Sequence, residues 1–121
     1  MKSSIREMKK DELKRVLGLI RMQDTRDARY ASRNYRDYFR RWGRGWDKVI
    51  VAEAGRTIAG VSCYFYDNHE ATGVYWLGYT YIHPQYQGYG IGSQLLKYIQ
   101  KDLKRRNARK LFLATSSDSI Y

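Results

Sequence analysis

The chain has 121 residues, 43% of them hydrophobic, so it is long enough to bury one sizeable core and too apolar for a wholly disordered protein. Lysine and arginine total 23 against 12 acidic residues, and this net charge of +11 favours polyanionic partners: nucleic acid, an acidic membrane surface or a phosphorylated small molecule. No segment approaches the ~20 consecutive apolar residues of a transmembrane helix, and the first residues lack the apolar core of a signal peptide. The sequence contains a single cysteine, which excludes an internal disulfide and a multi-cysteine metal cluster. We therefore expect one domain over residues 1–121, a cytoplasmic location, no membrane span and no metal.

Three elements are predicted in the first third of the chain. Residues 4–8 alternate apolar and polar side chains, which is typical of a short strand, and Asp11 is placed to cap a helix behind it. The buried face of that helix repeats at i, i+3, i+4 and i+7, with Leu13, Val16, Leu17 and Ile20. A second, arginine-rich helix is expected over residues 25–42, before Gly43 and Gly45. Its apolar face contains Ala28, Ala31, Tyr35, Tyr38, Phe39 and Trp42, and Tyr30 is also expected to pack.

The rest of the chain predicts a mixed sheet. Residues 49–54 and 58–66 form a hairpin around Gly55, and residues 74–82 form a long strand that stops before Pro84, because proline removes a ladder donor. A helix follows, which starts within residues 85–92 and runs to about residue 107, and a short strand is expected over residues 111–115. The helix has a buried face of Ile91, Leu95, Ile99 and Leu103. This strand–helix–strand order predicts a parallel pair, so the fold class is α+β, a mixed and mostly antiparallel sheet flanked by helices.

Three glycines alternate in the segment Gln87-Gly88-Tyr89-Gly90-Ile91-Gly92, between the end of a strand and the start of a helix. Glycine allows positive φ and leaves no Cβ in front of the main chain, so successive N–H groups can converge on one point beside the positive end of the helix dipole. This is an anion cradle suited to a phosphate or diphosphate. The spacing fits neither the P-loop nor the dinucleotide motif G-x-G-x-x-G. A glycine turn that serves only tight helix–sheet packing is the alternative.

Residues 82–96, IHPQYQGYGIGSQLL, resemble the acetyl-CoA motif of the GNAT family of N-acetyltransferases. That motif reads Q/R-x-x-G-x-G/A, and Gln87, Gly90 and Gly92 stand at its fixed positions. The segment Ile5-Arg6-Glu7-Met8 before Asp11 is similar to the family's first strand and helix start, and residues 51–60 are similar to its second and third strands. The resemblance covers nearly the whole chain and implies a GNAT-like acyl-CoA N-acyltransferase fold.

This resemblance implies an N-acetyltransferase in which a primary amine, on a small molecule or a protein, attacks acetyl-CoA directly. Main-chain amides of the glycine turn would hold the diphosphate of coenzyme A. Strand 74–82 would splay from strand 111–115 to admit the pantetheine arm, and its last residues would pair with that arm and polarise the thioester carbonyl. The residues thus assigned to acetyl-CoA are Tyr81, Ile82, His83, Gln87, Gly88, Tyr89, Gly90, Ile91, Gly92 and Ser93.

The family's general base is missing from this sequence. Many members carry a carboxylate on the fourth strand, but residues 77–81 read LGYTY. The catalytic residues are therefore unassigned, with Glu53, His83 and Tyr81 as candidates and with His69 and Glu70 in a polar loop. Each has a structural explanation as well: an ion pair for Glu53, a pre-proline turn for His83, solvent exposure for the loop. A tyrosine with a pKa of about 10 is a poor base at neutral pH.

The family's C-terminal part is also missing. After the strand at residues 111–115 the family continues with a helix that carries a tyrosine and then further strands, whereas this sequence ends at Tyr121. The resemblance therefore implies a C-terminally truncated fold, a natural short form, or a site that a partner chain completes. An exposed strand at residues 111–115 predicts a homodimer, which a clean monomer in sedimentation at micromolar concentration would contradict.

Two other functions stay open. A chain without a recognisable base or acid can be a non-catalytic acyl-CoA-binding module or fragment. The second helix also suits a basic nucleic-acid-binding protein, since residues 21–48 hold nine basic and four acidic side chains. Turnover of acetyl-CoA with amines tests the first, and salt-dependent binding of nucleic acid tests the second. Cys63, mid-strand among apolar neighbours, is expected to be a buried and unreactive thiol.

Overall fold

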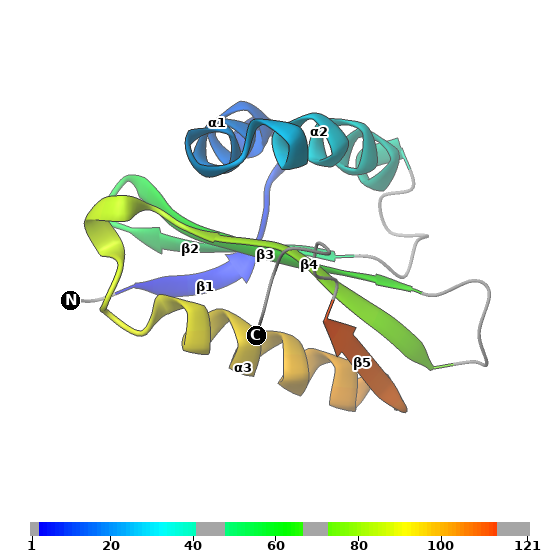
Figure 1. Ribbon diagram of the computed structural model, residues 1–121. Helices are drawn as coiled ribbons and strands as arrows, with labels where there is room; N and C mark the ends of the chain where they lie inside the picture. Colours follow the sequence, from blue (N-terminus) through cyan, green and yellow to red (C-terminus); the bar gives the residue numbers. More distant parts are fainter. Residues whose placement is uncertain (1–2, 41–47, 67–72, 114–121) are drawn as a thin grey trace.

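The computed structural model describes residues 3–40, 48–66 and 73–113, with the backbone alone for residues 37–40 and 113. The centre of the fold is a five-stranded sheet in the order β1-β2-β3-β4-β5, with α1 and α2 on one face and α3 on the other (Figure 1). The strands are β1 (Ser4–Glu7), β2 (Lys48–Ala54), β3 (Thr57–Tyr66), β4 (Val74–Ile82) and β5 (Lys110–Leu113). The helices are α1 (Leu13–Gln23), α2 (Thr25–Arg40) and α3 (Ile91–Arg105), with the short 3₁₀ helices η1 (Lys10–Glu12) and η2 (Pro84–Tyr86).

The sheet is antiparallel except at one edge. β2 and β3 form the predicted hairpin, in which Ala54 pairs with Thr57. β4 and β5 are parallel, with Tyr75 opposite Leu111, and α3 connects them. The predicted strand–helix–strand unit and the mixed α+β class are therefore confirmed.

Some predicted boundaries differ from the observed ones. β1 ends at Glu7, one residue earlier than the alternation predicts. α3 ends at Arg105 rather than near residue 107, because Asn107 adopts a φ of 59°, in the left-handed region that ends helices. The predicted ends of the second helix and of the last strand, at residues 42 and 115, lie outside the described residues.

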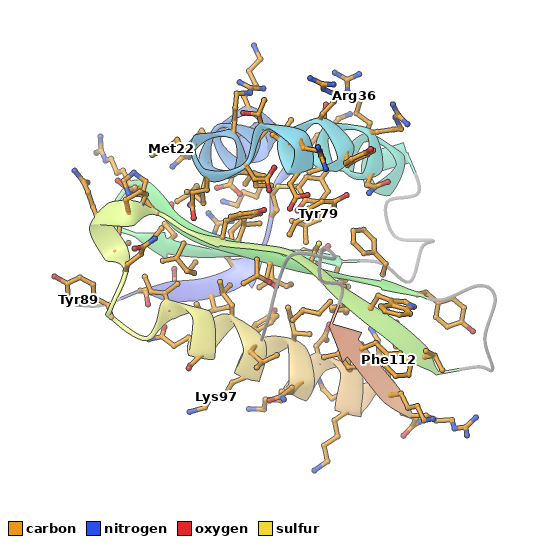
Figure 2. All side chains as sticks on the ribbon, in the orientation of Figure 1. Met22, Arg36, Tyr79, Tyr89, Lys97 and Phe112 are labelled. Atoms are coloured by element: carbon orange, nitrogen blue, oxygen red, sulfur yellow. The ribbon has the colours of Figure 1, made fainter. Side chains whose placement is uncertain are left out.

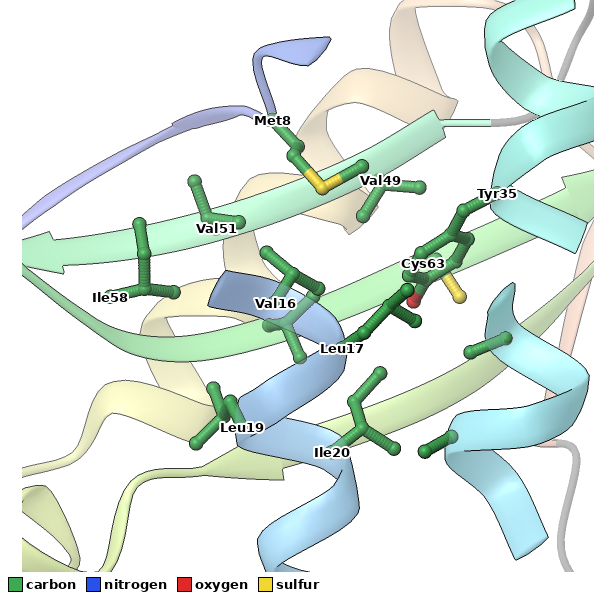
Figure 3. Close-up of a cluster of buried hydrophobic side chains, with 13 residues drawn as sticks. Met8, Val16, Leu17, Leu19, Ile20, Tyr35, Val49, Val51, Ile58 and Cys63 are labelled. Carbon is green, nitrogen blue, oxygen red and sulfur yellow. The ribbon is translucent and has the colours of Figure 1, made fainter. Parts of the chain in front are cut away.

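One core lies between the sheet and the α1–α2 pair (Figure 3). The predicted face of α1 packs into it, since Val16, Leu17 and Ile20 are buried and Leu13 is partly buried. The sheet side of this core consists of Met8, Val49, Val51, Ile58, Val61 and Cys63. The thiol of Cys63 is fully buried, as predicted, and donates to the Gly78 carbonyl at 2.9 Å.

The buried face of α2 is confirmed at Ala28, Ala31 and Tyr35. Tyr30 is 51% exposed, so the prediction that it packs against the core is wrong. The reason is geometric, because one helical residue turns a side chain by about 100° away from the buried Ala31. The predicted packing of residues 38, 39 and 42 falls on side chains outside the described part.

A second core lies beneath α3, on the opposite face of the sheet. The predicted stripe of Ile91, Leu95, Ile99 and Leu103 is buried there. One acid is buried beside it. The Tyr64 hydroxyl donates to the Asp102 carboxylate, which also accepts from Arg105 Nη2 at 2.9 Å, so the buried acid has its hydrogen-bond partners.

The start of α1 rests on Glu12 and not on the predicted Asp11. Asp11 is exposed, whereas the Glu12 side chain is 6% exposed and accepts the Lys9 N–H at 2.8 Å. Both Nη atoms of Arg6 also donate to Glu12, at 2.8 and 2.6 Å. These hydrogen bonds from Arg6 outweigh the effect of burial and lower the pKa of Glu12 to about 2. The capping residue is Glu12 and not Asp11 because the 3₁₀ helix η1, which contains both residues, precedes the α-helix.

None of the helices within residues 3–40, 48–66 and 73–113 is long and apolar enough to span a membrane. β5 is the last strand of the sheet, and its Phe112 is 40% exposed. The Phe112 ring lies beside that of Trp76, with 5.1 Å between the ring centroids. Homodimerisation through this edge stays a prediction.

We expect the Glu12 carboxylate to stabilise the fold above its unfolded pKa of about 4.5, and to lose this contribution as the pH falls toward its folded value of about 2. Glu12→Gln should lower the free energy of unfolding by about 2 kcal/mol at neutral pH. Its deficit relative to the parent chain should shrink as the pH falls below about 4.5. Urea unfolding at several pH values measures both. Asp11→Asn, at the exposed neighbour, should change stability by less than about 0.5 kcal/mol. A Glu12→Gln deficit that is equal at every pH would contradict the assignment.

Candidate functional site

β4 carries one extra residue midway along its length. Gly78 pairs with Cys63 and Tyr81 pairs with Val61, so a single residue of β3 faces two residues of β4. Tyr79 takes up the extra length with a φ of 50°, in the left-handed region that tyrosine rarely adopts. Backbone strain of this kind is concentrated at functional sites, which makes this stretch of β4 a candidate site.

The bulge moves the side chains of β4 to the other face. Before it, Tyr75 and Leu77 pack in the cluster under α3. After it, Tyr79 and Tyr81 pack in the cluster under α1 and α2, although strict alternation would keep all four on one face. Figure 2 shows Tyr79 between the sheet and α2. Both tyrosines therefore line the α2 side of the candidate site.

The outer edge of β4 has no neighbouring strand in the described part of the chain after the bulge. The parallel register with β5 runs from Val74 opposite Lys110 to Leu77 opposite Leu113, and no described residue continues it along residues 78–82. Main-chain groups on such an edge can pair with an extended ligand, as they do when a peptide adds a strand to a sheet.

The end of β4 is fastened to the neighbouring segments by main-chain groups. Gln23 Nε2, from the end of α1, donates to the Ile82 carbonyl at 2.8 Å. The His83 N–H donates to the Ala59 carbonyl of β3 at 2.8 Å. The His83 ring accepts the Gln85 N–H at Nδ1, at 3.1 Å, so this residue shapes the turn into η2.

The glycine turn combines positive φ angles with main-chain donors that have no acceptor in the described part of the chain. Gly88 and Gly90 have φ of 86° and 77°, and Gly90 is the N-cap of α3. The Gln94 N–H donates to the Gly90 carbonyl at 3.1 Å, whereas the N–H groups of residues 88–93 have no acceptor among the described residues. A Cβ on Gly88 or Gly90 would meet nothing within 4 Å. Tyr89 is 57% exposed and projects away from the fold (Figure 2). An anion in front of this turn would meet unbonded donors and a helix N-terminus together.

A close approach between α3 and β3 sets the position of this turn. A Cβ on Gly60 would lie 3.0 Å from both Ile82 Cδ1 and Ile91 Cγ2, and 3.2 Å from Leu95 Cδ1. Ile91 and Leu95 are buried, so they have little room to retreat. The missing side chain of Gly60 therefore lets the first turn of α3 sit directly on the sheet beside the end of β4.

A polar and aromatic cluster lies on the other face, beneath α2. The Tyr81 hydroxyl donates to the Asp27 carboxylate, and Asn34 Nδ2 donates to the Tyr79 hydroxyl at 2.9 Å. Tyr79 stands edge-on to Tyr35, with 5.9 Å between ring centroids. Burial, followed by the neighbouring Cys63 thiol, raises the pKa of Tyr79 to about 12, so even less of the phenolate form is present at neutral pH than for a free tyrosine.

The predicted catalytic candidates do not come together. Glu53 lies on β2, two strands from β4, and its carboxylate is 3.4 Å from Arg6 Nη2, as its structural explanation predicts. His83 and Tyr81 lie at the end of β4. His69 and Glu70 lie outside the described residues. Within the described residues, no three His, Cys, Asp or Glu side chains are grouped to hold a metal ion.

Sequence reasoning overlooked Asp27 because it looked for a carboxylate on the strands and in the loops and not on the second helix. Asp27, Ala31 and Asn34 follow each other at i, i+4 and i+7, which places them on one helical face. Since Ala31 is buried, this spacing predicts a partly buried carboxylate turned toward the sheet. The ten residues assigned to acetyl-CoA, by contrast, follow a continuous path from the end of β4 through η2 to the first turn of α3.

Residues 6–120 match the Acetyltransferase (GNAT) family. The chain belongs to the GNAT family. An acetyltransferase of Yersinia pestis (strain Pestoides F) is 34% identical over 70 residues, which make up 58% of this chain and 47% of that protein. The chain thus spans about half the length of the curated relatives it matches.

Solved structures show the same GNAT fold. A GNAT-family protein from Desulfovibrio desulfuricans superposes with a TM-score of 0.85 at 20% sequence identity, covering 96% of this chain and 75% of that one. A GNAT family acetyltransferase from Brucella melitensis, in complex with acetyl-CoA, superposes with a TM-score of 0.75 at 19% identity, covering 97% of this chain and 78% of that one. At these identities the likeness concerns the fold, and it confirms the GNAT-like architecture that residues 82–96 predict.

Gly60→Ala should destabilise this GNAT fold where α3 meets the sheet. The added methyl group has to displace buried side chains, so we expect a loss of about 1–2 kcal/mol in the free energy of unfolding. Gly18→Ala is the matched control, because a Cβ on this α1 residue would meet nothing within 4 Å. It should raise stability by up to about 1 kcal/mol through helix propensity. Urea unfolding compares the two, and a Gly60→Ala variant as stable as the parent chain would contradict the close approach.

Proposed function

We propose that this chain transfers the acetyl group of acetyl-CoA to a primary amine and that its glycine turn holds the diphosphate of coenzyme A. The observation that carries the proposal is the row of N–H groups at residues 88–93, which have no acceptor in the described part of the chain, in a turn where a Cβ on Gly88 or Gly90 would meet nothing within 4 Å. Membership of the GNAT family supports it, as does the acetyl-CoA bound in the Brucella relative. The acceptor amine would be carried by a small molecule or a protein.

The backbone of the turn suits a diphosphate. Its donors lie at the N-terminus of the 15-residue helix α3. The dipole of such a helix places roughly half a positive charge at that end. Tyr81 and Ile82, at the end of β4, would pair through their main chain with the amides of the pantetheine arm, the Ile82 carbonyl through the lone pair that Gln23 leaves open. The His83 N–H takes no part in this pairing, because it already donates to Ala59.

The reaction begins when the neutral amine attacks the carbonyl carbon of the thioester. A C–N bond forms and the C–S bond breaks, so coenzyme A leaves as a thiolate. The nitrogen loses one proton and the thiolate gains one. Negative charge develops on the carbonyl oxygen in the transition state, where a main-chain N–H of β4 would stabilise it. The protein therefore has to supply one donor to the oxygen and one proton acceptor to the amine.

Asp27 would supply the carboxylate that β4 lacks. It reaches from the first turn of α2 to the hydroxyl of Tyr81, beyond the bulge. A carboxylate in this position attracts the ammonium form of the acceptor and can take its proton, either directly or through the Tyr81 hydroxyl. The amine would then approach from the α2 face and the diphosphate from the N-terminus of α3, and the two substrates would meet at the edge of β4.

Gly90→Asn tests the diphosphate site. Asparagine tolerates positive φ, so the loop should keep its shape while a side chain fills the space in front of the donors. We expect the Kd of acetyl-CoA, measured by isothermal titration, to rise at least about tenfold, which is about 1.4 kcal/mol. Gly55→Asn is the matched control, since Gly55 in the β2–β3 turn has a φ of 61° and equally open surroundings. It should leave the Kd unchanged. Equal affinity in both variants would refute the assigned cradle.

Asp27→Asn separates an enzyme from a module that only binds acyl-CoA. The amide can still accept the Tyr81 hydrogen bond, but it carries no charge and takes no proton. We expect release of free thiol from acetyl-CoA, in the presence of pooled peptides and small amines, to fall at least about tenfold. The Kd of acetyl-CoA should stay within about twofold, because Asp27 lies across the sheet from α3. Asp11→Asn, at an exposed carboxylate, controls for loss of charge. A parent chain that binds acetyl-CoA and releases no thiol with any amine would favour the non-catalytic module.

A further inference from the structure

A groove runs along α2 on the side where it meets α1. Its volume is about 610 Å³. Four arginines line it, Arg21 from α1 and Arg29, Arg33 and Arg36 from α2. Thr25, Ala28 and Ser32 also line it, and their side chains are too small to fill it. Figure 2 shows Arg36 pointing away from the sheet, and all four arginines of the groove are exposed.

The positive charge of this groove is uncompensated in the described part of the chain. Three of the groove's arginines, Arg29, Arg33 and Arg36, share one side of α2 with Arg26, which does not line the groove itself, because the four recur at i, i+3, i+7 and i+10. All four are exposed, and none of them forms an ion pair with a described carboxylate. The carboxylate of Asp27, on the same helix, is turned toward Tyr81 and the sheet. The result is a stripe of four guanidinium groups along about 15 Å of helix.

The chemistry of this stripe favours phosphate groups in a row. A guanidinium group presents a planar fork of donors that matches phosphate oxygens, and arginine is used here throughout, without lysine. Successive arginines of the stripe advance by about 4.5 to 6 Å along the helix, so neighbouring arginines can contact different phosphates of one strand. Tyr30, 51% exposed, lies four residues after Arg26 and three before Arg33, where its ring can stack on a base. An acidic peptide would leave this ring without a partner.

We propose that the arginine groove binds the phosphate backbone of a single-stranded nucleic acid, with Tyr30 as a stacking platform. The groove lies on the α1–α2 side of the sheet, and α3 with its glycine turn lies on the other side (Figure 1). This site is therefore separate from the turn assigned to acetyl-CoA, and the proposal holds whether or not the chain transfers acetyl groups.

The test is fluorescence anisotropy with a labelled oligouridine of about twelve nucleotides, within the range of known single-strand sites, over a series of salt concentrations. The double variant Arg29→Gln/Arg33→Gln should weaken binding at least about tenfold and reduce the slope of log K against log salt by about 1.4, since each contacted phosphate contributes about 0.7. Lys97→Gln/Lys101→Gln is the matched control. It removes the same charge from exposed positions on α3, where Lys97 points away from the sheet (Figure 2), and should change affinity less than about twofold.

Two further measurements identify the ligand. Tyr30→Ala should weaken oligouridine binding severalfold and leave the salt slope unchanged, because stacking releases no counterions. A polyglutamate of the same charge should compete poorly. Equal losses in the arginine and lysine double variants would overturn the groove as the site, and a polyglutamate that binds as tightly as the oligonucleotide would overturn nucleic acid as its ligand. Displacement of the oligonucleotide by saturating acetyl-CoA would contradict the separation of the two sites.

Discussion

Hydrogen bonds and close packing at the end of β4 decide whether the glycine turn can keep its donors free. Main-chain N–H groups form hydrogen bonds wherever a neighbour allows it, so a row of unbonded donors persists only on a backbone that cannot collapse. Here the carbonyl of Ile82 is held by Gln23 and the N–H of His83 by Ala59. The first turn of α3 is held against Gly60 by contacts that leave no room for a methyl group. These restraints hold both ends of a glycine-rich turn, as the proposed binding site requires.

The bulge in β4 divides the candidate site between the two faces of the sheet. One extra residue at Tyr79 breaks the alternation, so the tyrosines that follow it lie under α2 while the chain that leaves β4 leads to α3. The acetyl donor and the amine acceptor of the proposed reaction can therefore reach the same stretch of strand from opposite sides. The register shift also coincides with the point where the described pairing with β5 ends, which frees the main chain on that edge.

Charge in this protein is used in two distinct ways. Arg6 pairs with Glu12 from the neighbouring strand and lowers the pKa of that carboxyl, and Arg105 pairs with Asp102 one turn away on α3. The arginines of α2 have no such partners among the described residues, although their helix contains carboxylates. Because Asp27 is turned inward toward Tyr81, its charge does not offset theirs on the outer surface. A net charge of +11 is thus concentrated in part on one helix rather than spread evenly.

Sequence patterns alone determined the order of the elements, the hairpin, the parallel pair and the glycine turn, because each follows from periodicity or from residues with special backbone freedom. They also determined the buried faces of α1 and α3, where apolar side chains repeat at helical spacing. Tertiary structure decided the position of the bulge, since a strand of nine mostly apolar residues gives no local sign of where its alternation breaks. It also decided the cap at Glu12, the exposure of Tyr30 and the pairing of Asp27 with Tyr81. Each of these depends on which segments meet in space. A sequence pattern shows the period of each element and the position of each turn, but it does not show the distance between side chains of different elements.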